Sequence, residues 1–407
     1  MTSSNIGARP LSRATWLRRF AWLGLMGIGW ATAQPTQPST LFSIRAGDLF
    51  GLIDASGKVL LPPEFFEIKP GEPLTLVRKG NRTAYVDGTG RMVIEPQEAL
   101  SQPFASGLSL APGKDAQGRL RYGYVDATRA FVIPPTWEQA ETFVDGLAVV
   151  GVADAWGVLK FGAIDRSGRL VLPATHSKLL APAGGLVRSE LNESPKDAAL
   201  RRPSPVGIGQ SGTAPFAQER THRVFDRRGR DITPPGIDFV GVPVNGMVRV
   251  WAGRQQGFMS DEGELSVPPR FEQAGDFHEG RAKVWISGKY GYIDGRGELV
   301  VPARFEVAED FSDGLALVKL DGRSLFIGPT GQVVLQPDVE RAWPFSQGLA
   351  AVRVAGKHGF IDKQGRLVIE PQFSFARPFD RGLAYVGQGR ASGYILPSGR
   401  FVWRSEN

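Results

Sequence analysis

The chain has 407 residues, of which 42% are hydrophobic and 22% are charged, and it carries a formal net charge of +7. This composition is ordinary for a globular protein and excludes a chain that is disordered throughout. The sequence contains no cysteine, which excludes disulfide bonds, a thiolate nucleophile and a zinc site built on cysteine.

The first 33 residues predict a secretory signal peptide. An apolar run, AWLGLMGIGWATA, ends in the cleavage pattern Ala31-Thr32-Ala33, and no acidic residue occurs in the segment. The arginines that precede this run are Arg9, Arg13, Arg18 and Arg19. We expect Sec export, cleavage after Ala33 and a periplasmic or secreted protein, with twin-arginine export as the alternative. A membrane anchor is disfavoured, because 13 residues fall short of the roughly 20 that a spanning helix needs.

Residues 34–40 (QPTQPST) form a polar linker, and no membrane span is expected in the mature chain. Most of the net positive charge belongs to the signal peptide. Four of the 48 basic residues lie in it, and the remaining 44 face 41 acidic residues. Since no run of lysine and arginine occurs either, the sequence predicts no nucleic-acid partner.

Two sets of glycines, each spaced by 34 residues, indicate an internal repeat. The first set is Gly229, Gly263, Gly297, Gly331, Gly365 and Gly399, and the second is Gly246, Gly280, Gly314, Gly348 and Gly382. The earlier half follows the same pattern with irregular spacing. We count ten units, with irregular repeats over 41–188, an inserted polar loop over 189–222 and regular repeats over 223–407.

Each unit predicts three short β-strands. In regular copies they read GLALV (314–318), YGYID (290–294) and ELVVP (298–302), which are runs rich in β-branched and aromatic residues. The last two strands are joined by an Asp-x-x-Gly turn, in which the carboxylate accepts backbone N–H groups. We expect a proline to end the third strand and two later phenylalanines to pack between neighbouring units. The turn aspartates are Asp54, Asp87, Asp126, Asp165, Asp226, Asp294 and Asp362.

The segments Lys289–Asp294 (KYGYID), Lys357–Asp362 (KHGFID) and Phe311–Val318 (FSDGLALV) resemble units of the WG-repeat (KWG repeat) family, and the resemblance covers nearly all of 41–407. It implies a bacterial, β-rich and often exported protein, with no shared catalytic residues and no common ligand. The family's tryptophan is replaced by another aromatic residue or by histidine, which keeps a packing role but loses the indole donor. The replacements are Phe50, Tyr122, Phe161, Tyr290 and His358.

The irregular units carry their additional residues at one place only. The connection between the first and second strands is longer by 5, 5 and 27 residues, whereas the Asp-x-x-Gly turn keeps its length. Insertions confined to one kind of loop lie on one face of a repeat array, which is often the binding face. The candidate binding residues on these insertions are Trp156, Arg201, Arg202 and Arg220. For the longest insertion, a tolerated disordered loop is the alternative.

No catalytic residue, metal site or cofactor is predicted. The recurrent aspartates invite comparison with carboxylate pairs or calcium sites, but their turns explain them, and Ser260 and Gly328 replace them in two units. The histidines, His176, His222, His278 and His358, are scattered and lack the spacing of a zinc motif. Nucleophile-elbow, P-loop and H-E-x-x-H motifs are missing from the sequence.

These observations predict an all-β fold of tandem three-stranded antiparallel units, packed as a propeller or as an elongated stack. We favour the propeller, although ten units exceed the usual 4–8 blades and no strand is left over to close a ring. Two lobes and an open array are the alternatives. The favoured function is an exported, non-enzymatic scaffold of the bacterial envelope that binds a protein or glycan partner through the insertion-bearing loops. A glycan hydrolase or lyase and a passive structural spacer are the other hypotheses.

Overall fold

The computed structural model describes residues 41–97, 102–190 and 222–405. The predicted signal peptide, its cleavage site, the linker 34–40 and most of the 189–222 insertion lie outside the described residues. The described chain is built from strands and turns, and it holds no helix of the length and hydrophobicity needed to cross a bilayer.

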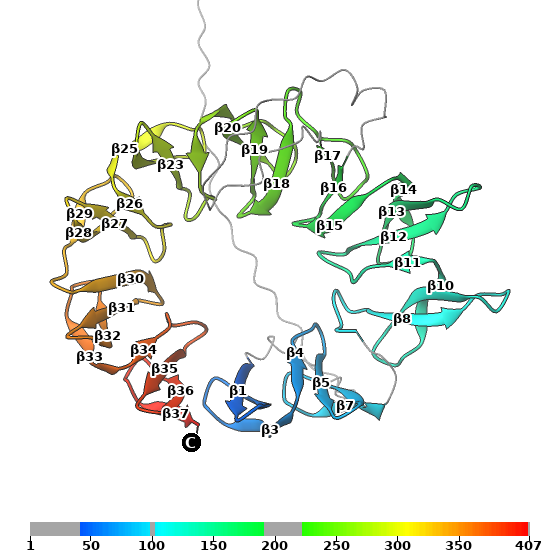
Figure 1. Cartoon of the computed structure of the whole chain (residues 1–407), viewed down its shortest axis with the longest axis horizontal. Helices are drawn as coiled ribbons and strands as arrows, with labels where there is room; N and C mark the ends of the chain where they lie inside the picture. The colour runs from blue at the N-terminus through cyan, green and yellow to red at the C-terminus, as the bar shows by residue number, and fades with distance from the viewer. Residues whose placement is uncertain (1–40, 98–101, 191–221, 406–407) are drawn as a thin grey trace, which may run out of the picture. The chain divides into compact units, whose positions relative to one another are not determined.

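The strands form ten antiparallel sheets, which are the blades of one β-propeller (Figure 1). Blades 1 to 3 contain β1 (Phe42–Ala46), β2 (Leu49–Ile53), β3 (Val59–Phe65); β4 (Glu67–Lys69), β5 (Thr75–Lys79), β6 (Arg82–Val86), β7 (Met92–Gln97); and β8 (Ser109–Lys114), β9 (Leu120–Val125), β10 (Phe131–Trp137). Blades 4 to 6 contain β11 (Gln139–Ala140), β12 (Leu147–Ala153), β13 (Leu159–Asp165), β14 (Leu170–His176); β15 (Leu179–Ala183), β16 (Leu186–Glu190), β17 (His222–Phe225); and β18 (Phe239–Val244), β19 (Met247–Ala252), β20 (Gln255–Ser260), β21 (Val267–Phe271). Blades 7 and 8 contain β22 (Gln273–Ala274), β23 (Ala282–Ile286), β24 (Lys289–Ile293), β25 (Leu299–Phe305); and β26 (Val307–Ala308), β27 (Ala316–Leu320), β28 (Arg323–Ile327), β29 (Val333–Leu335). Blades 9 and 10 contain β30 (Arg341–Ser346), β31 (Leu349–Val354), β32 (Lys357–Asp362), β33 (Leu367–Phe373); and β34 (Phe375–Ala376), β35 (Ala384–Gln388), β36 (Ala391–Ile395), β37 (Phe401–Arg404).

Within a blade the strands are hydrogen-bonded in chain order, with the first strand nearest the centre of the ring (Figure 1). The three strands predicted per unit are present in nine blades, and we name them strands a, b and c. In eight blades an inner strand of two to six residues precedes strand a, as β22 precedes β23 in blade 7. Among the described residues, blades 1 and 3 have no paired inner strand and blade 5 has no strand c.

The expectation that a proline ends strand c is wrong. In blade 7, strand c runs through Pro302, because it lies at the outer edge of its sheet, where a residue without an N–H group is tolerated. The strand bulges there: Tyr292 pairs with Val301, but Tyr290 pairs with Phe305, so strand c carries two extra residues. Blades 1, 3, 4, 6 and 9 have the same two-residue bulge.

A glycine in strand b makes room for this bulge. A Cβ atom on Gly291 would lie 2.6 Å from the carbonyl oxygen of Val301, closer than any real contact. All six blades with the two-residue bulge have glycine at this position, namely Gly51, Gly123, Gly162, Gly257, Gly291 and Gly359. Blade 2 has Ala84 there and only one extra residue in strand c, and in blade 8, with Leu325 there, strand c ends at Leu335. The glycine therefore permits the bulge but does not by itself produce it, since in blade 10 Gly393 pairs with Arg404 and Tyr394 with Trp403 in register.

The hydrophobic core lies between blades rather than within them. One cluster joins Tyr292 and Val301 of blade 7 to Phe311 and Val318 of blade 8. The expected packing of phenylalanines between units is confirmed, because the rings of Tyr292 and Phe311 meet edge to face at 4.9 Å. Equivalent contacts between successive blades join Phe258 to Phe277, Phe326 to Phe345 and Phe360 to Phe379.

The ring is closed by contact between blade 10 and blade 1. Phe42 and Ile44 of β1 are buried together with Leu383 of blade 10 and pack against Tyr394. The Tyr394 hydroxyl donates a hydrogen bond of 3.0 Å to the carbonyl oxygen of Ser43. As predicted, the array begins on a strand a and ends on a strand c, but side-chain packing closes the ring without a strand left over. The propeller alternative is therefore correct, and two lobes and an open array are not.

Candidate functional site

The two faces of the propeller differ in which turns they carry, because the chain reverses direction at every strand. Turns between strands a and b lie on one face, which we call the insertion face. Turns between strands b and c, and between inner strands and strands a, lie on the other. In blades 3 and 4 the predicted five-residue insertions lengthen the a–b hairpin, with pairing that continues to Lys114↔Leu120 and Ala153↔Leu159. Figure 1 shows both hairpins projecting beyond the rest of the ring.

Trp156 lies at the tip of the blade 4 hairpin, and its side chain is 89% exposed. The backbone N–H groups of Trp156 and Val158 both donate to Oδ1 of Asp154, at 2.9 Å, so the turn is held while the indole faces solvent. The other predicted binding residues, Arg201, Arg202 and Arg220, lie outside the described residues. Their association with Trp156 stays a prediction.

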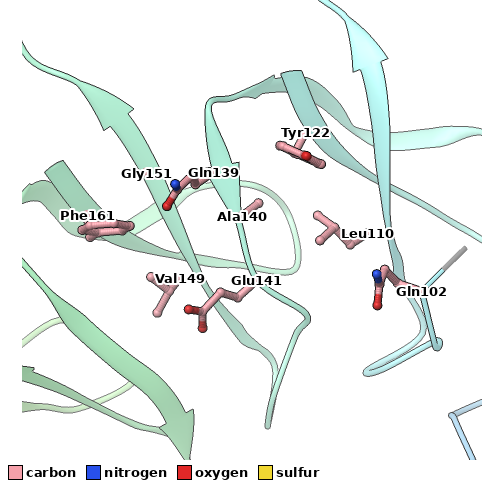
Figure 2. Close-up of a pocket in the computed structure, with 9 residues that line it drawn as sticks. All are labelled: Gln102, Leu110, Tyr122, Gln139, Ala140, Glu141, Val149, Gly151 and Phe161. Atoms are coloured by element: carbon pink, nitrogen blue, oxygen red, sulfur yellow. The ribbon is translucent and has the colours of Figure 1, made fainter. Parts of the chain in front are cut away.

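A pocket of about 300 Å3 lies between blades 3 and 4. Figure 2 shows side chains from blade 3 on one side and from blade 4 on the other. The lining residues are Gln102, Leu110 and Tyr122 of blade 3 and Gln139, Ala140, Glu141, Val149, Gly151 and Phe161 of blade 4. None of these residues was predicted to bind a ligand.

One lining residue, Leu110, lies at a strand a position where blades 6 and 7 have a long cationic side chain. Leu110 stands opposite Tyr124, just as Arg249 stands opposite Phe258 and Lys283 opposite Tyr292. Arg249 and Lys283 reach across to the next blade, where they form ion pairs of 2.7 Å with Asp276 and 3.2 Å with Asp310. A leucine does not span this distance, and blade 8 also has a leucine at this position, Leu317, which stands opposite Phe326.

Glu141 provides the charge in this pocket. Its carbonyl oxygen accepts the Tyr124 hydroxyl at 2.6 Å, which fixes the backbone. Partial burial raises the pKa of its carboxyl group, although much of the side chain is exposed. Within the described residues, the side chains of Gln102, Gln139 and Glu141 have no hydrogen-bond partner, and no cationic side chain lines the pocket. The pocket therefore offers two unused carboxamides and one unpaired carboxylate beside an apolar wall.

The sequence pattern described as "WG containing repeat" matches six segments of the chain, residues 50–82, 122–156, 257–290, 290–323, 326–357 and 359–389. The chain belongs to the WG-repeat family. No curated protein matches it in sequence.

Several solved structures are similar to this WG-repeat chain at low identity. A eukaryotic initiation factor is 12% identical, with 91% of this chain and 96% of that chain covered and a TM-score of 0.45. BamB from Moraxella catarrhalis is 13% identical, with coverage of 82% and 91% and a TM-score of 0.30. AztD from Citrobacter koseri is 12% identical, with coverage of 89% and 93% and a TM-score of 0.28. With such low sequence identities and TM-scores, none of the three structures supports a conclusion about the function of the WG-repeat chain.

The residues that replace the tryptophan of the WG repeat are half-buried. The rings of Tyr290 and His358 pack against Trp285 and Trp343, with centroids 4.6 and 5.1 Å apart. Each replacement is paired with an aromatic residue or a histidine: Phe50 with Phe65, Tyr122 with Trp137, Phe161 with His176, Tyr290 with Phe305 and His358 with Phe373. The predicted packing role is therefore present in these blades.

The turn aspartates of the WG repeats lie on the face opposite the insertions, each in a different blade. Oδ1 of Asp54 accepts the N–H groups of Ser56 and Lys58 at 2.9 and 3.0 Å and the Ser56 hydroxyl at 2.6 Å. The hydrogen bond from the Ser56 hydroxyl contributes most to lowering the pKa of Asp54. The same backbone bonds occur at Asp87, Asp126, Asp165, Asp226, Asp294 and Asp362, and Ser260 makes them through its hydroxyl. These carboxylates serve their own turns and form no pair with one another.

The histidines also lie in separate blades. Burial lowers the pKa of His176, Nε2 of His278 is 3.6 Å from Asp310, and His358 packs against Trp343 at 5.1 Å. The side chain of His222 lies outside the described part. In 41–97, 102–190 and 222–405, no three acidic or histidine side chains form a group able to hold a metal ion.

Proposed function

We propose that this WG-repeat protein is an exported, non-enzymatic binding scaffold that contacts a protein or glycan partner through the insertion face of blades 3 to 5. One observation carries the proposal: the lengthened a–b connections fall in three consecutive blades and on one face. Export rests on the predicted signal peptide. It is tested by N-terminal sequencing of the protein from the periplasm or medium, where we expect a chain that begins at Gln34.

Exposure of apolar side chains at the ordered hairpins supports the scaffold role. Trp156 is 89% exposed, Leu120 64% and Val158 52%. A lengthened hairpin with an apolar tip costs solubility, and large exposed aromatic residues are typical of binding surfaces. The hydrolase or lyase hypothesis has weaker support, because a glycosidase needs two carboxylates about 5–9.5 Å apart. Glu141 is the one carboxylate among the residues that line the pocket.

Affinity capture from an envelope extract tests the scaffold. The bait is the mature chain, compared with Trp156→Ala and with a variant whose blade 4 hairpin is shortened to a two-residue turn like Ser287-Gly288 of blade 7. Phe66→Ala is the matched control, since Phe66 is 59% exposed at the link between blades 1 and 2. We expect both blade 4 variants to lose a partner that the control retains. Equal capture by all four baits contradicts the proposal and favours the structural spacer.

A further inference from the structure

We propose that the pocket between blades 3 and 4 binds one pyranose unit of a glycan, either neutral or carrying an amino group. The inference rests on the proposed function, because it names the partner class for the same part of the propeller. It goes further in placing the sugar in a defined open pocket rather than on the hairpin tips.

The size and walls of the pocket suit a sugar ring. A volume of about 300 Å3 is at the lower end of the range for small-molecule sites. Leu110 and Val149 supply an apolar wall, and Tyr122 and Phe161 add aromatic rings from the two blades. Aromatic side chains offer flat apolar area to the C–H face of a pyranose, while the polar groups meet its hydroxyls.

The unpaired polar groups favour hydroxyls over the ammonium group of a partner protein's lysine. A hydroxyl both donates and accepts hydrogen bonds, and so does a carboxamide. Gln102 and Gln139 each present a carboxamide with no partner among the described residues. An ammonium group has donors only, so it would leave the N–H groups of both amides unused.

Glu141 sets the charge preference. Its carboxylate accepts hydrogen bonds from hydroxyls and attracts an amino group, but it repels the carboxylate of an acidic sugar. Since no cationic side chain among the lining residues compensates it, acidic sugars are disfavoured. In blades 6 and 7 the chain fills the equivalent place itself, with Arg249 and Lys283.

The test measures the binding of N-acetylglucosamine, glucosamine and glucuronate to the mature chain by NMR titration. We expect dissociation constants of about 1 mM or tighter for the first two sugars and binding at least tenfold weaker for glucuronate. Leu110→Lys places an ammonium group beside the next blade, as Lys283 does, and should abolish binding of N-acetylglucosamine and glucosamine. Glu141→Gln should weaken glucosamine binding at least tenfold and N-acetylglucosamine binding less.

The control is Glu309→Gln. Glu309 has the repeat position of Glu141 in blade 8, and its carbonyl oxygen accepts the Tyr292 hydroxyl at 2.7 Å, as that of Glu141 accepts Tyr124. It does not line the pocket, so sugar binding should be unchanged. Thermal unfolding of each variant shows that a loss of binding is not a loss of fold.

Three results overturn the inference: no binding of the amino or neutral sugar, equal binding of glucuronate and glucosamine to the original chain, or binding of the amino or neutral sugar that survives Leu110→Lys. Binding of a lysine amide in place of the sugars, lost in Leu110→Lys, assigns the pocket to a protein side chain and also overturns it. The two proposals fail separately. Partner capture that depends on Trp156 without sugar binding removes the pocket assignment alone, and sugar binding without hairpin-dependent capture removes the hairpin contact alone.

Discussion

The carboxylate of Asp313 accepts a hydrogen bond of 2.6 Å from the backbone N–H of Gly348, which belongs to the next blade. Asp313 is the first residue of a two-residue turn between the inner strand and strand a, with φ of 55°, and Gly314 follows with φ of 81°. The same link joins Glu279 to Gly314, Gln347 to Gly382, Ser106 to Gly146 and Asp145 to Gly184. A side chain in each of these inner turns therefore ties its blade to the following one.

Removing one such link should weaken the contact between two blades. We expect Asp313→Ala to lower the free energy of unfolding by about 1–2 kcal/mol more than Asp321→Ala, because only Asp313 accepts a hydrogen bond from the next blade. Asp321 is the matched control, since it has a φ of 50° in the a–b turn of the same blade. Denaturant titration measures both. Equal losses would show that the backbone strain of the turn, rather than the link, sets the effect.

Gly291→Ala should destabilise the protein by about 1–3 kcal/mol, because its Cβ would lie 2.6 Å from the Val301 carbonyl oxygen and strand c would have to move. Gly295→Ala is the control. No atom lies within 4 Å of a Cβ at Gly295, so its effect should stay within about 0.5 kcal/mol. Thermal unfolding measures the stability of both variants. An unchanged stability of Gly291→Ala would contradict the role assigned to this glycine.

Protonation of the turn aspartates should lower the stability of the fold in acid. The pKa is lowered at Asp54 and Asp126 mainly by the hydroxyls of Ser56 and Thr128. At Asp87, Asp165, Asp226 and Asp362 partial burial acts in the opposite direction, and hydrogen bonds within the turn outweigh it. Since the folded pKa values lie below the unfolded value of about 3.9, this stabilisation is complete above that pH and is lost as the pH falls through the folded values.

Unfolding temperatures measured from pH 7 to pH 2 check this expectation. Asn substitutions at Asp54 and Asp126 keep the acceptor oxygen but do not titrate, so the decline below pH 4 should be shallower in that double variant. An acid profile identical to that of the original chain would assign the acid sensitivity to other groups.

The contact between the first and last blades should be sensitive to Phe42. Phe42 is 5% exposed and meets Tyr394 of blade 10 with ring centroids 5.4 Å apart. We expect Phe42→Ala to cost about 3 kcal/mol of unfolding free energy, through the lost contact and the cavity it leaves. Phe66→Ala, at a residue that is 59% exposed, should change stability by less than about 0.5 kcal/mol. A small effect of Phe42→Ala would mean that the ring does not depend on this contact.

Much of the fold was predictable because it rests on local signals. The Asp-x-x-Gly turn at Asp54 needs only its own residues, and the 34-residue spacing identified the units without reference to their packing. The path of strand c through Pro302 was not predictable, since a proline is tolerated there only because the strand is outermost in its sheet. Closure was also undecidable from the sequence, because Phe42 and Tyr394 come from opposite ends of the chain.

The candidate site was predicted only in part. The insertions at Asp115–Gly118 and Asp154–Gly157 were visible as changes in spacing, and they fold as lengthened hairpins. The pocket was missed because its lining combines residues from two blades, and the packing of those blades was not known from the sequence. Leu110 lies at the repeat position of Arg249 and Lys283, but it gave no distinctive signal, since Leu317 of blade 8 has the same position.

Every blade is encoded by one uninterrupted stretch of sequence, and the first and last blades meet without sharing a strand. Duplication or loss of one 34-residue segment in the gene would therefore leave every remaining sheet with its own hydrogen bonds. The number of blades is then set by how many blades, packed side by side, complete the ring, and not by the order of strands along the chain. Such a ring can gain or lose one blade at a time, and each change requires new packing only where the first and last blades meet.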